Sequence, residues 1–370
     1  MIRIAYAFSI ISGTIIGAGF FALPYLTLKT NPFVMAIYFV VLGLVSILVH
    51  YFFADAALKT PNYIRLPGFA KYHLGKKAYK IALISGVLSV LGSNLAYLIL
   101  GGKFLQAIFA PFFGMGETFY TIIYFAIGAI LIFFGIKAID KVQLGGLILL
   151  FVSLVALFVK GGSQIDFSQL IFESNPSFFL LPFGVVLFSL WGVSLVPEAE
   201  EVLKEKSNYL KKIIPFAVIL PMIVYLLFIV LILGLSGNET PPDALSFLNK
   251  SLGANLTYLI LSMAIITTFT SFIALGLTLK KMLWHDLKIN EKLSWAIASF
   301  VPISLYFLGI KDFIQVIGFV GGIMLAIDGI IVSLIYKKLS SLSVRFIVYP
   351  VILILVLGVF SEIISFFLCK

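Results

Sequence analysis

The sequence predicts an all-α integral membrane protein of eleven membrane-spanning helices, built as two inverted repeats of five helices plus one extra helix. The first observation is composition, because 61% of the 370 residues are hydrophobic and only 11% are charged. A soluble domain is about 45–50% apolar and about 25% charged. The second is a series of long apolar runs joined by short connections, and the third is an interruption by glycine and proline in the first and sixth runs.

Eleven apolar runs are long enough for membrane helices, which need about 20 mostly apolar residues. They cover residues 4–28, 32–57, 79–110, 118–137, 142–160, 177–198, 211–236, 251–284, 293–310, 312–336 and 344–368. The connections are too short for soluble domains, so we expect one transmembrane domain over 1–370. Its repeats would cover about 1–160 and about 177–336, with 344–368 as the extra helix. An odd number of spans in each repeat makes the two repeats opposite in orientation.

Charge gives the orientation in the membrane. Most of the 26 Lys and Arg residues fall in every second connection, and such positive connections stay in the cytoplasm. We therefore expect a multi-pass protein of the cell membrane with a cytoplasmic N-terminus and an extracytoplasmic C-terminus. The net charge of +10 then reports topology, and we expect contact with the lipid bilayer, no nucleic-acid partner and a monomer. The basic connection 58–78 predicts a short interfacial helix. Cys369 is the single cysteine, so no internal disulfide can form.

The first run carries three glycines, Gly13, Gly17 and Gly19, and then Pro24. Glycine costs a helix about 1 kcal/mol relative to alanine and proline about 3 kcal/mol, so this run is weak, closely packed or broken. Close packing alone would need only the small-xxx-small face of the first two glycines. The loose match to a dinucleotide fingerprint lacks the acid expected about 20 residues later, and no small-residue cleavage site indicates a signal peptide. A broken helix would expose backbone that is tolerated only where it is buried or lines a cavity.

The sixth run is interrupted in the same way, by Gly192 in its middle and Pro197 five residues later. Transporters built from inverted repeats have broken helices at corresponding places in the two halves. The first and sixth runs are corresponding positions in a five-plus-five arrangement. This agreement favours a break over simple close packing in the first run.

Two segments resemble a known group of proteins. They are Gly-Thr-Ile-Ile-Gly-Ala-Gly-Phe-Phe-Ala-Leu-Pro in the first run and Leu-Pro-Phe-Gly … Phe-Ser-Leu-Trp-Gly … Pro-Glu in the sixth. With eleven spans, they look like the amino acid–polyamine–organocation superfamily, and most like its amino acid/auxin permeases and hydroxy/aromatic amino acid permeases. The resemblance covers the whole chain in topology and is sharp only in these two segments. It implies the LeuT-type fold, with helices 1 and 6 broken in mid-membrane.

The expected function is secondary active transport, not enzyme catalysis. We expect import of neutral L-amino acids, aromatic or small apolar ones among them, by cation symport and alternating access. A proton-coupled permease remains an alternative, as does a non-transporting amino acid receptor or a channel on the same fold. A channel would favour a continuous polar pore, a receptor a sizeable soluble tail, and a membrane enzyme a dense set of acids, histidines or metal ligands at one depth. None of these patterns is visible in the sequence.

The broken ends predict where a zwitterion binds. Amides at Gly17–Gly19 begin the second half of helix 1, where the helix dipole favours an anionic carboxylate. Carbonyls near Phe188, Ser189 and Trp191 could accept from the substrate ammonium. The full set of candidate substrate-binding residues is Thr14, Gly17, Ala18, Gly19, Asn94, Tyr97, Phe188, Ser189, Trp191 and Phe269.

A cation site is predicted at the other freed end of helix 1, where the Gly13 and Ile16 carbonyls are negative. Thr267, Thr270 and Ser271 share one helical face in the eighth run, although such hydroxyls often bond back to their own helix. The resemblance implies that Thr270 and Ser271 complete a Na⁺ site. Related proton-coupled members place a lysine there from the fifth run, and this fifth run has none before Lys160. We therefore favour Na⁺ over H⁺ as coupling ion and expect no other cofactor.

Charged residues inside membrane runs are functional candidates by default. Asp328 is central in the tenth run and could carry a proton or act in a gate. Glu198 is placed at the inner mouth, where a salt bridge is the simpler interpretation, and Asp55 is expected to pair with a cation of the loop. The three histidines, His50, His73 and His285, are far apart in sequence and indicate no metal cluster.

Overall fold

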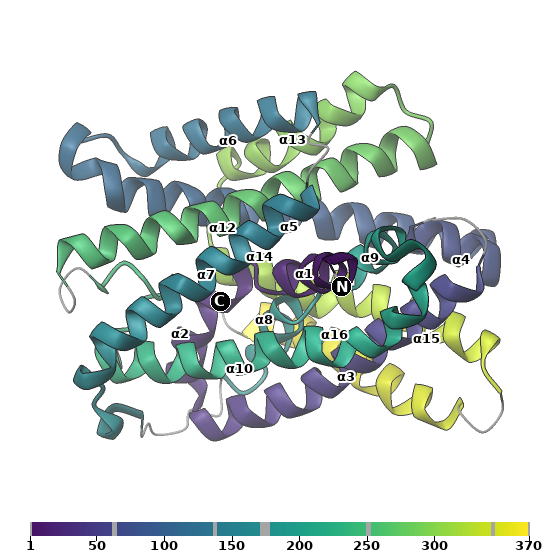
Figure 1. The fold of residues 1–370 in the computed structure, drawn as a ribbon, viewed down its shortest axis with the longest axis horizontal. Helices are drawn as coiled ribbons and strands as arrows, with labels where there is room; N and C mark the ends of the chain where they lie inside the picture. Colours follow the sequence, from purple (N-terminus) through teal and green to yellow (C-terminus); the bar gives the residue numbers. More distant parts are fainter. Residues whose placement is uncertain are drawn as a thin grey trace.

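The structure, a computed structural model, describes residues 2–60, 65–135, 139–170, 178–248, 253–341 and 345–368. In this part of the chain every regular element is a helix (Figure 1). In order they are α1 (Ile2–Ile15), η1 (Ala18–Ala22), α2 (Leu23–Thr30), α3 (Pro32–Lys59), α4 (Leu66–Leu74), α5 (Lys76–Phe113), α6 (Glu117–Phe134), α7 (Ile139–Gly161), η2 (Gly162–Gln164), η3 (Phe167–Leu170), α8 (Pro182–Ser189), η5 (Val193–Leu195), α9 (Val196–Leu203), η6 (Lys204–Tyr209), α10 (Leu210–Ser236), η7 (Gly237–Glu239), α12 (Ala254–Lys281), η8 (Met282–Asp286), α13 (Glu291–Phe307), α14 (Phe313–Phe319), η9 (Val320–Leu325), α15 (Ala326–Leu339) and α16 (Arg345–Leu368). Cys369 and the His285 side chain lie outside the described residues.

Each of the eleven predicted runs corresponds to one helix or to a short series of helical pieces. Eight helical stretches of the described chain are apolar and long enough to cross a membrane. One of them, Pro182–Glu239, contains the sixth and seventh runs together. The ninth run forms α13, which has only 17 residues, and the fifth run forms α7, which lies alongside its neighbours in the bundle (Figure 1). The fold class predicted from the sequence is confirmed.

Local sequence explains where helices begin and end around the first break. Pro24 lies in the first turn of α2 and Pro32 in the first turn of α3, where a missing N–H costs nothing. Asn31 turns the chain between these helices with φ 146° and accepts a hydrogen bond from the Phe33 N–H at 2.7 Å. The expected interfacial helix is α4, although residues 61–64 of that connection are outside the described residues.

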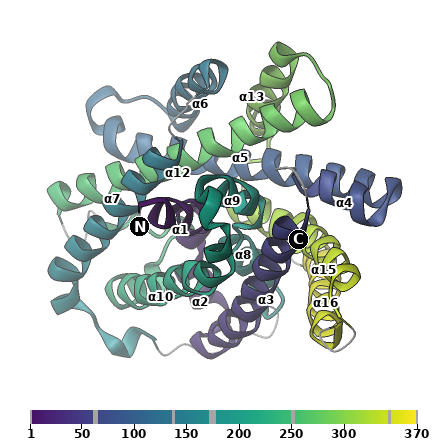
Figure 2. The same cartoon turned by 45° about the vertical axis from the view of Figure 1, so that its right-hand side comes forward.

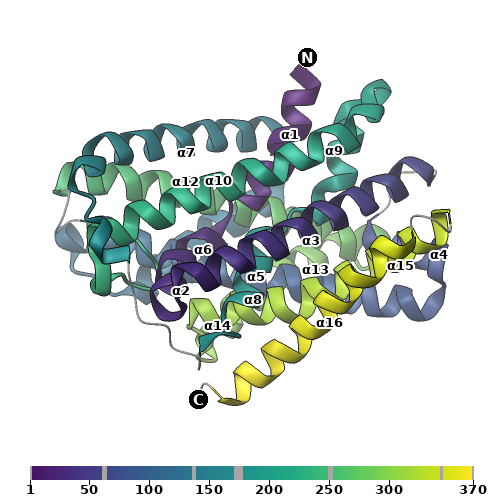
Figure 3. The same cartoon turned by 90° about the horizontal axis from the view of Figure 1, so that it is seen from below.

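The interrupted helices lie at the centre of the bundle (Figure 2). The first half of helix 1, α1, packs on α7, α9 and α10, and the first half of helix 6, α8, packs on α3, α14 and η9. In contrast, α6 and α13 lie at the periphery (Figure 2), and α16 runs along α15 at another edge (Figure 3). Large apolar side chains such as Phe134 and Phe216 are 78% and 69% exposed, as expected for surfaces that the hydrocarbon of a bilayer covers.

Candidate functional site

Helix 1 is broken between α1 and η1. Gly17 leaves the helical region with φ −104° and ψ −146°, and helical structure resumes at Ala18. A Cβ at Gly17 would overlap the Tyr97 hydroxyl, and a Cβ at Gly19 would lie 2.9 Å from Cδ1 of Phe188. Both glycines are therefore required by the close approach of α5 and α8, and the helix is both broken and closely packed.

Helix 6 is broken between α8 and η5, and α3 satisfies the unwound backbone. The Ser46 hydroxyl donates to the Leu190 carbonyl at 2.6 Å, and the Gly192 N–H donates to Nε2 of His50 at 3.0 Å. The other ring nitrogen, Nδ1, donates to the Ser46 carbonyl at 2.7 Å. Since Nε2 accepts, the imidazole is neutral with its proton on Nδ1. The unwound segment is thus held by two residues one helical turn apart.

The ends of the two broken helices meet at the hydroxyl of Tyr225 on α10. This oxygen lies 2.6 Å from the carbonyl oxygen of Ile15 and 2.8 Å from that of Ser189, the last residues of α1 and α8. The C-terminal end of a helix carries about half a negative charge. One phenolic proton can serve only one carbonyl fully, so the pair of helix ends favours a cationic group or one with several donors.

The amide end of the break is held by Tyr97 of α5. Its hydroxyl lies against the Ala18 backbone and the Ser271 side chain of α12. The side chain of Tyr97 is buried. Ala18, predicted to receive the substrate carboxylate, is therefore engaged by a tyrosine in this arrangement.

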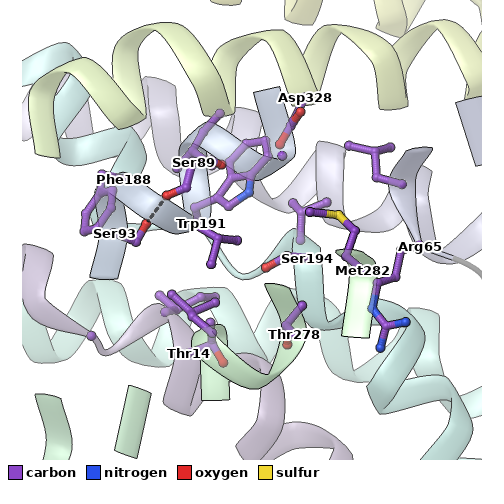
Figure 4. Close-up of a pocket in the computed structure, with 18 of the residues that line it drawn as sticks. Thr14, Arg65, Ser89, Ser93, Phe188, Trp191, Ser194, Thr278, Met282 and Asp328 are labelled. Atoms are coloured by element: carbon purple, nitrogen blue, oxygen red, sulfur yellow. Dashed lines mark hydrogen bonds between the residues drawn. The ribbon is translucent and has the colours of Figure 1, made fainter. Parts of the chain in front are cut away.

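A cavity lies beside both breaks (Figure 4). The space open to the centres of water molecules is about 80 Å³, several times the 10–15 Å³ or so that one water requires. Six of the ten predicted substrate-binding residues line it, namely Thr14, Gly17, Gly19, Tyr97, Phe188 and Trp191. The remaining wall is largely apolar, with Leu275, Leu325 and Val193 among its residues.

The other four predicted substrate-binding residues do not line the cavity. Ala18 is buried at the start of η1, and the Ser189 hydroxyl donates to the Val185 carbonyl at 2.7 Å. The Phe269 ring packs edge-on against Tyr124, with ring centres 5.0 Å apart. Asn94 is fully buried, and neither atom of its amide has a hydrogen-bond partner in the described part of the chain.

The cavity extends toward one face of the molecule. Arg65 and Met282 lie at one end of it, and Phe188 and Ser93 at the other (Figure 4). Arg65 precedes α4 and Met282 follows α12, so this end of the cavity points to the face on which α1 begins.

Beyond the breaks, on the opposite side, four phenylalanine rings form a cluster that we call the aromatic seal: Phe20, Phe21, Phe104 and Phe228. The ring centres of Phe20 and Phe228 are 4.8 Å apart, and those of Phe21 and Phe104 are 5.1 Å apart. All four side chains are buried, so the seal closes the cavity on that side.

Hydroxyl groups follow one face of α5 at intervals of one turn. Ser89, Ser93 and Tyr97 line the cavity, and one turn earlier the Ser85 hydroxyl is hydrogen-bonded to the Asp328 carboxylate. Asp328 also lines the cavity and forms no ion pair with any described residue. Ser85 and Tyr97 are twelve residues apart, which corresponds to about 18 Å along the helix axis. Asp328 is therefore bonded to α5 about three turns from Tyr97, in the half of the cavity nearer α4, while its neighbour Gly329 lies beside the Trp191 ring.

Ion pairs lie near the end of the cavity that Arg65 lines and near the C-terminal end of α3. Glu198 of α9 accepts from Arg65 at 3.0 Å, so the salt bridge expected at this residue is present. Asp55 lies between Lys59, at 2.7 Å, and Lys211. The expectation that Asp55 pairs with a nearby cation is confirmed.

The residues predicted for the cation are distributed over two helices. Thr267 and Thr270 donate to carbonyls of their own helix, at 2.9 Å each, and Ser271 contacts Tyr97. Gly13 and Ile16 lie at the end of α1, whose main neighbours are α7, α9 and α10, whereas α12 packs on α5, α6, α7 and α13. In the described chain, α1 and α12 are not extensively packed on each other. No group of His, Cys, Asp and Glu in the described residues is arranged to hold a metal ion.

Three residues of this site were missed by sequence reasoning. They are Tyr225, Ser46 and His50, and each forms a hydrogen bond with backbone at a broken helix. In the sequence, each is distinguished only by being a polar residue in an apolar run. Ser46 and His50 are four residues apart in a run of apolar residues, a spacing that places them on one face. That pair is the signal that would have identified them.

The sequence pattern of the tryptophan/tyrosine permease family matches residues 2–365. No curated protein sequence matches the chain. Among solved structures, the fold is similar to that of MhsT in complex with L-phenylalanine, with TM-score 0.71, 14% identity and coverage of 100% of this chain and 98% of that one. It is also similar to Mhp1, a nucleobase-cation-symport-1 family transporter, in a closed conformation with bromovinylhydantoin bound, with TM-score 0.66, 13% identity and coverage of 98% and 90%. At this level of identity the likeness concerns the fold alone.

Proposed function

The chain belongs to the tryptophan/tyrosine permease family, and from this premise we propose that it imports neutral L-amino acids, aromatic ones included, by symport with a cation. The observation that carries the proposal is the meeting of two broken helices beside one cavity. The C-terminal ends of α1 and α8 converge on one point and suit an ammonium group, and the amides of Gly17–Gly19 suit a carboxylate. One α-amino acid satisfies both.

The wall of the cavity supports a neutral substrate side chain. Phe188 and Trp191 provide aromatic surfaces, and Leu275 and Leu325 complete an apolar wall. Stacking on such rings favours an aromatic substrate. The only described acid in the cavity, Asp328, is bonded to Ser85, about three turns of α5 away from Tyr97, and so is not at the level of the amides and carbonyls proposed to bind the zwitterion.

The direction of opening supports alternating access. With the N-terminus in the cytoplasm, the cavity extends toward the inside and the aromatic seal closes the outside. This is the arrangement expected of a transporter that faces inward. In such transporters one helical bundle rocks against the rest around a fixed site.

We propose Na⁺ as the coupling ion, at the carbonyls of Gly13 and Ile16 and the hydroxyls of Thr270 and Ser271. Oxygen ligands of this kind suit a hard cation. In the described chain α1 and α12 are not extensively packed on each other, which agrees with a site that has released its ion to the cytoplasm. Binding Na⁺ would require these two helices to approach each other.

A proton-coupled permease is the second candidate, and Asp328 favours it. This acid is buried, faces the cavity and has no cation among the described residues. A buried carboxylic acid without a cation is most stable in its neutral form. Exposure to the inner solution through the cavity would then allow the proton to leave.

The two candidates are separated by uptake of radiolabelled tryptophan and tyrosine into proteoliposomes under an imposed Na⁺ gradient or an imposed pH gradient. Accumulation driven by Na⁺ and abolished in Thr270→Ala supports the first proposal. Thr257→Ala, which removes a hydroxyl bonded to the Gly253 carbonyl at the other end of α12, is the matched control. Accumulation driven by pH alone, and lost in Asp328→Asn, supports the second. Binding without accumulation under either gradient would overturn both and point to a receptor.

A further inference from the structure

One acid of the membrane region has no part in the proposed transport mechanism. Glu362 lies on α16, six residues before the helix ends at Leu368. Its carboxyl oxygen Oε2 is buried and has no hydrogen-bond partner in the described residues. A buried polar atom without a partner is rare in folded proteins and needs an explanation.

The carboxyl group of Glu362 rests on a cradle of three glycines from three different elements. The position of a Cβ on Gly184 of α8 would be 2.7 Å from Oε2, on Gly318 of α14 2.9 Å from Oε1, and on Gly322 of η9 2.8 Å from Oε2. A fourth glycine, Gly321, meets the Gly184 carbonyl so closely that no Cβ would fit. The carboxyl group therefore fills a space that exists only while α8 packs directly on α14 and η9.

No described cation reaches this carboxyl group. Helix α16 packs on α3, α8, η9 and α15, and neither α8, α14 nor η9 contains a charged residue or histidine. The titratable groups of the other two elements are engaged elsewhere: Lys337 lies over the Tyr349 ring, Lys338 donates to the His73 carbonyl, Asp328 is bonded to Ser85, Asp55 pairs with Lys59 and Lys211, His50 is bonded to Gly192, and Tyr38 donates to the Phe179 carbonyl. Tyr51 lies under Lys211, and Tyr336 stacks on Phe52.

The charge state of Glu362 follows from this environment. An ionised carboxylate is costly inside a membrane unless a cation or several donors compensate it. The three glycines of the cradle offer this carboxyl group no side-chain donor or cation. A neutral carboxylic acid fits such a site, and an ionised one does not.

We propose that Glu362 is a proton-binding site that links the packing of α8 against η9 to the pH of the solution on the side where α16 ends. The inference rests on the proposed function, because it takes α8 to be the half of helix 6 that moves during alternating access. While the seal is closed, the cradle keeps Oε2 of the carboxyl group away from solvent and favours the protonated acid. When α8 moves away from η9, Glu362 meets water and releases the proton to that side.

The consequence is a fixed direction of the pH effect. Acid on the side where α16 ends stabilises the packed arrangement of α8 and therefore the inward-facing state. Alkaline solution on that side favours its separation and the outward-facing state. Only a proton is exchanged, and it returns to the side from which it came, so the site regulates transport without adding to the charge carried.

The test reads the conformation directly and in the absence of substrate. In a Cys369→Ser background, Ser194→Cys places the only cysteine in the cavity that faces inward. Its rate of alkylation by a membrane-impermeant maleimide trapped inside proteoliposomes reports the inward-facing population. We expect acidification of the outer solution to raise that rate by about fivefold or more, the usual size of such couplings.

Glu362→Gln keeps the shape of the neutral acid and cannot ionise, so its labelling should be high at every outer pH. Glu117→Gln, a change of an acid at the start of α6 on the same face, should keep the pH dependence. Gly184→Ala fills the cradle and should lower labelling at every pH, which tests the packing even if the glutamine variant folds poorly. Labelling of the parent that ignores outer pH, or a pH dependence that survives in Glu362→Gln, would overturn the proposal. Failure of the proposed transport function would appear separately, as absence of amino acid accumulation in the uptake assay.

Discussion

The two broken helices satisfy their freed backbone groups in different ways. In helix 6, Ser46 and His50 of α3 bond to the unwound segment. Each of these two side chains bonds to one backbone group of that segment, the Leu190 carbonyl and the Gly192 N–H. In helix 1, two tyrosine hydroxyls from two different helices serve the freed groups, and each hydroxyl is shared with a second partner. A fully satisfied break is a fixed part of the structure. A break held by shared hydroxyls is one at which a ligand can take over the bonds.

We predict the largest loss of stability from a substitution at the break of helix 6, whose backbone groups are fully bonded. His50→Ala removes the acceptor of the Gly192 N–H and leaves a cavity at a fully buried position. An unsatisfied buried donor costs about 1–3 kcal/mol, and the lost packing adds to it, so we expect about 3 kcal/mol in all. Thermal unfolding in detergent measures this. His73→Ala on α4, outside the breaks, is the control, and equal losses in the two variants would show that the bond to Gly192 has no special weight.

The next largest effect is expected at the close approach between the two breaks. Gly19→Ala places a Cβ 2.9 Å from both Phe188 and the Cα of Ser189. Overpacking of this kind costs about 1–3 kcal/mol, and it separates the two broken helices, so the maximal rate of transport should fall more than stability does. Gly145→Ala, where nothing lies within 4 Å, should leave both unchanged. A Gly19→Ala variant with a normal rate would mean that the two breaks need not touch.

At Tyr225 we predict a smaller loss of stability together with a gain in substrate affinity. Tyr225→Phe removes the hydroxyl that occupies both helix ends, so stability should fall by about 1 kcal/mol, the usual net value of a hydrogen bond. A substrate ammonium then meets no competitor, and apparent affinity should rise by about fivefold, the equivalent of 1 kcal/mol. Tracer uptake as a function of substrate concentration measures it. Tyr306→Phe is the matched control, since its hydroxyl donates to the Glu117 carboxylate at 3.5 Å, at the start of α6. Weaker binding in Tyr225→Phe would show that the hydroxyl contacts the substrate instead.

The smallest predicted effect is a pH dependence of stability at His73, a histidine outside the breaks that can be compared with His50. Burial and the nearby Lys338 lower the pKa of His73, which lies on α4 outside the membrane spans. Below the unfolded pKa of about 6.5, the unfolded chain binds the proton more readily than the folded chain. The stability contributed by neutral His73 is therefore complete above that pH and is lost as the pH falls through the folded pKa. His73→Gln should remove this part of the acid sensitivity. Loss of all acid sensitivity in that variant would show that the His50 bond at the break does not respond to pH.

Sequence reasoning located both breaks because their causes are local. Gly17 and Gly192 weaken a helix whatever surrounds them, and their positions in two repeats agree with each other. The ion pairs of Asp55 and Glu198 were predictable because both acids are close to cations in sequence or in the expected topology, whereas the orientation inferred from the charge of the connections stays a prediction. These features needed no knowledge of which helices touch.

The partners of the broken ends could not be predicted in the same way. Tyr225 contacts Ile15 across the bundle, and nothing in an apolar run distinguishes it from Tyr124, which packs on aromatic rings. Asn94 was expected beside the substrate because it shares a helical face with Tyr97, and Phe269 because its ring suits an apolar pocket, but neither residue lines the cavity of the structure. Helix phase at that precision depends on tertiary packing, which periodicity alone does not determine.

The aromatic seal also has a thermal consequence. Moving Phe20, Phe21, Phe104 and Phe228 apart exposes buried apolar surface to water, and such exposure carries a positive heat-capacity change. The balance between inward-facing and outward-facing states should therefore curve with temperature instead of following a straight van't Hoff line. Hydrophobic stabilisation of the aromatic seal weakens on cooling. Low temperature should therefore raise the population of the outward-facing state.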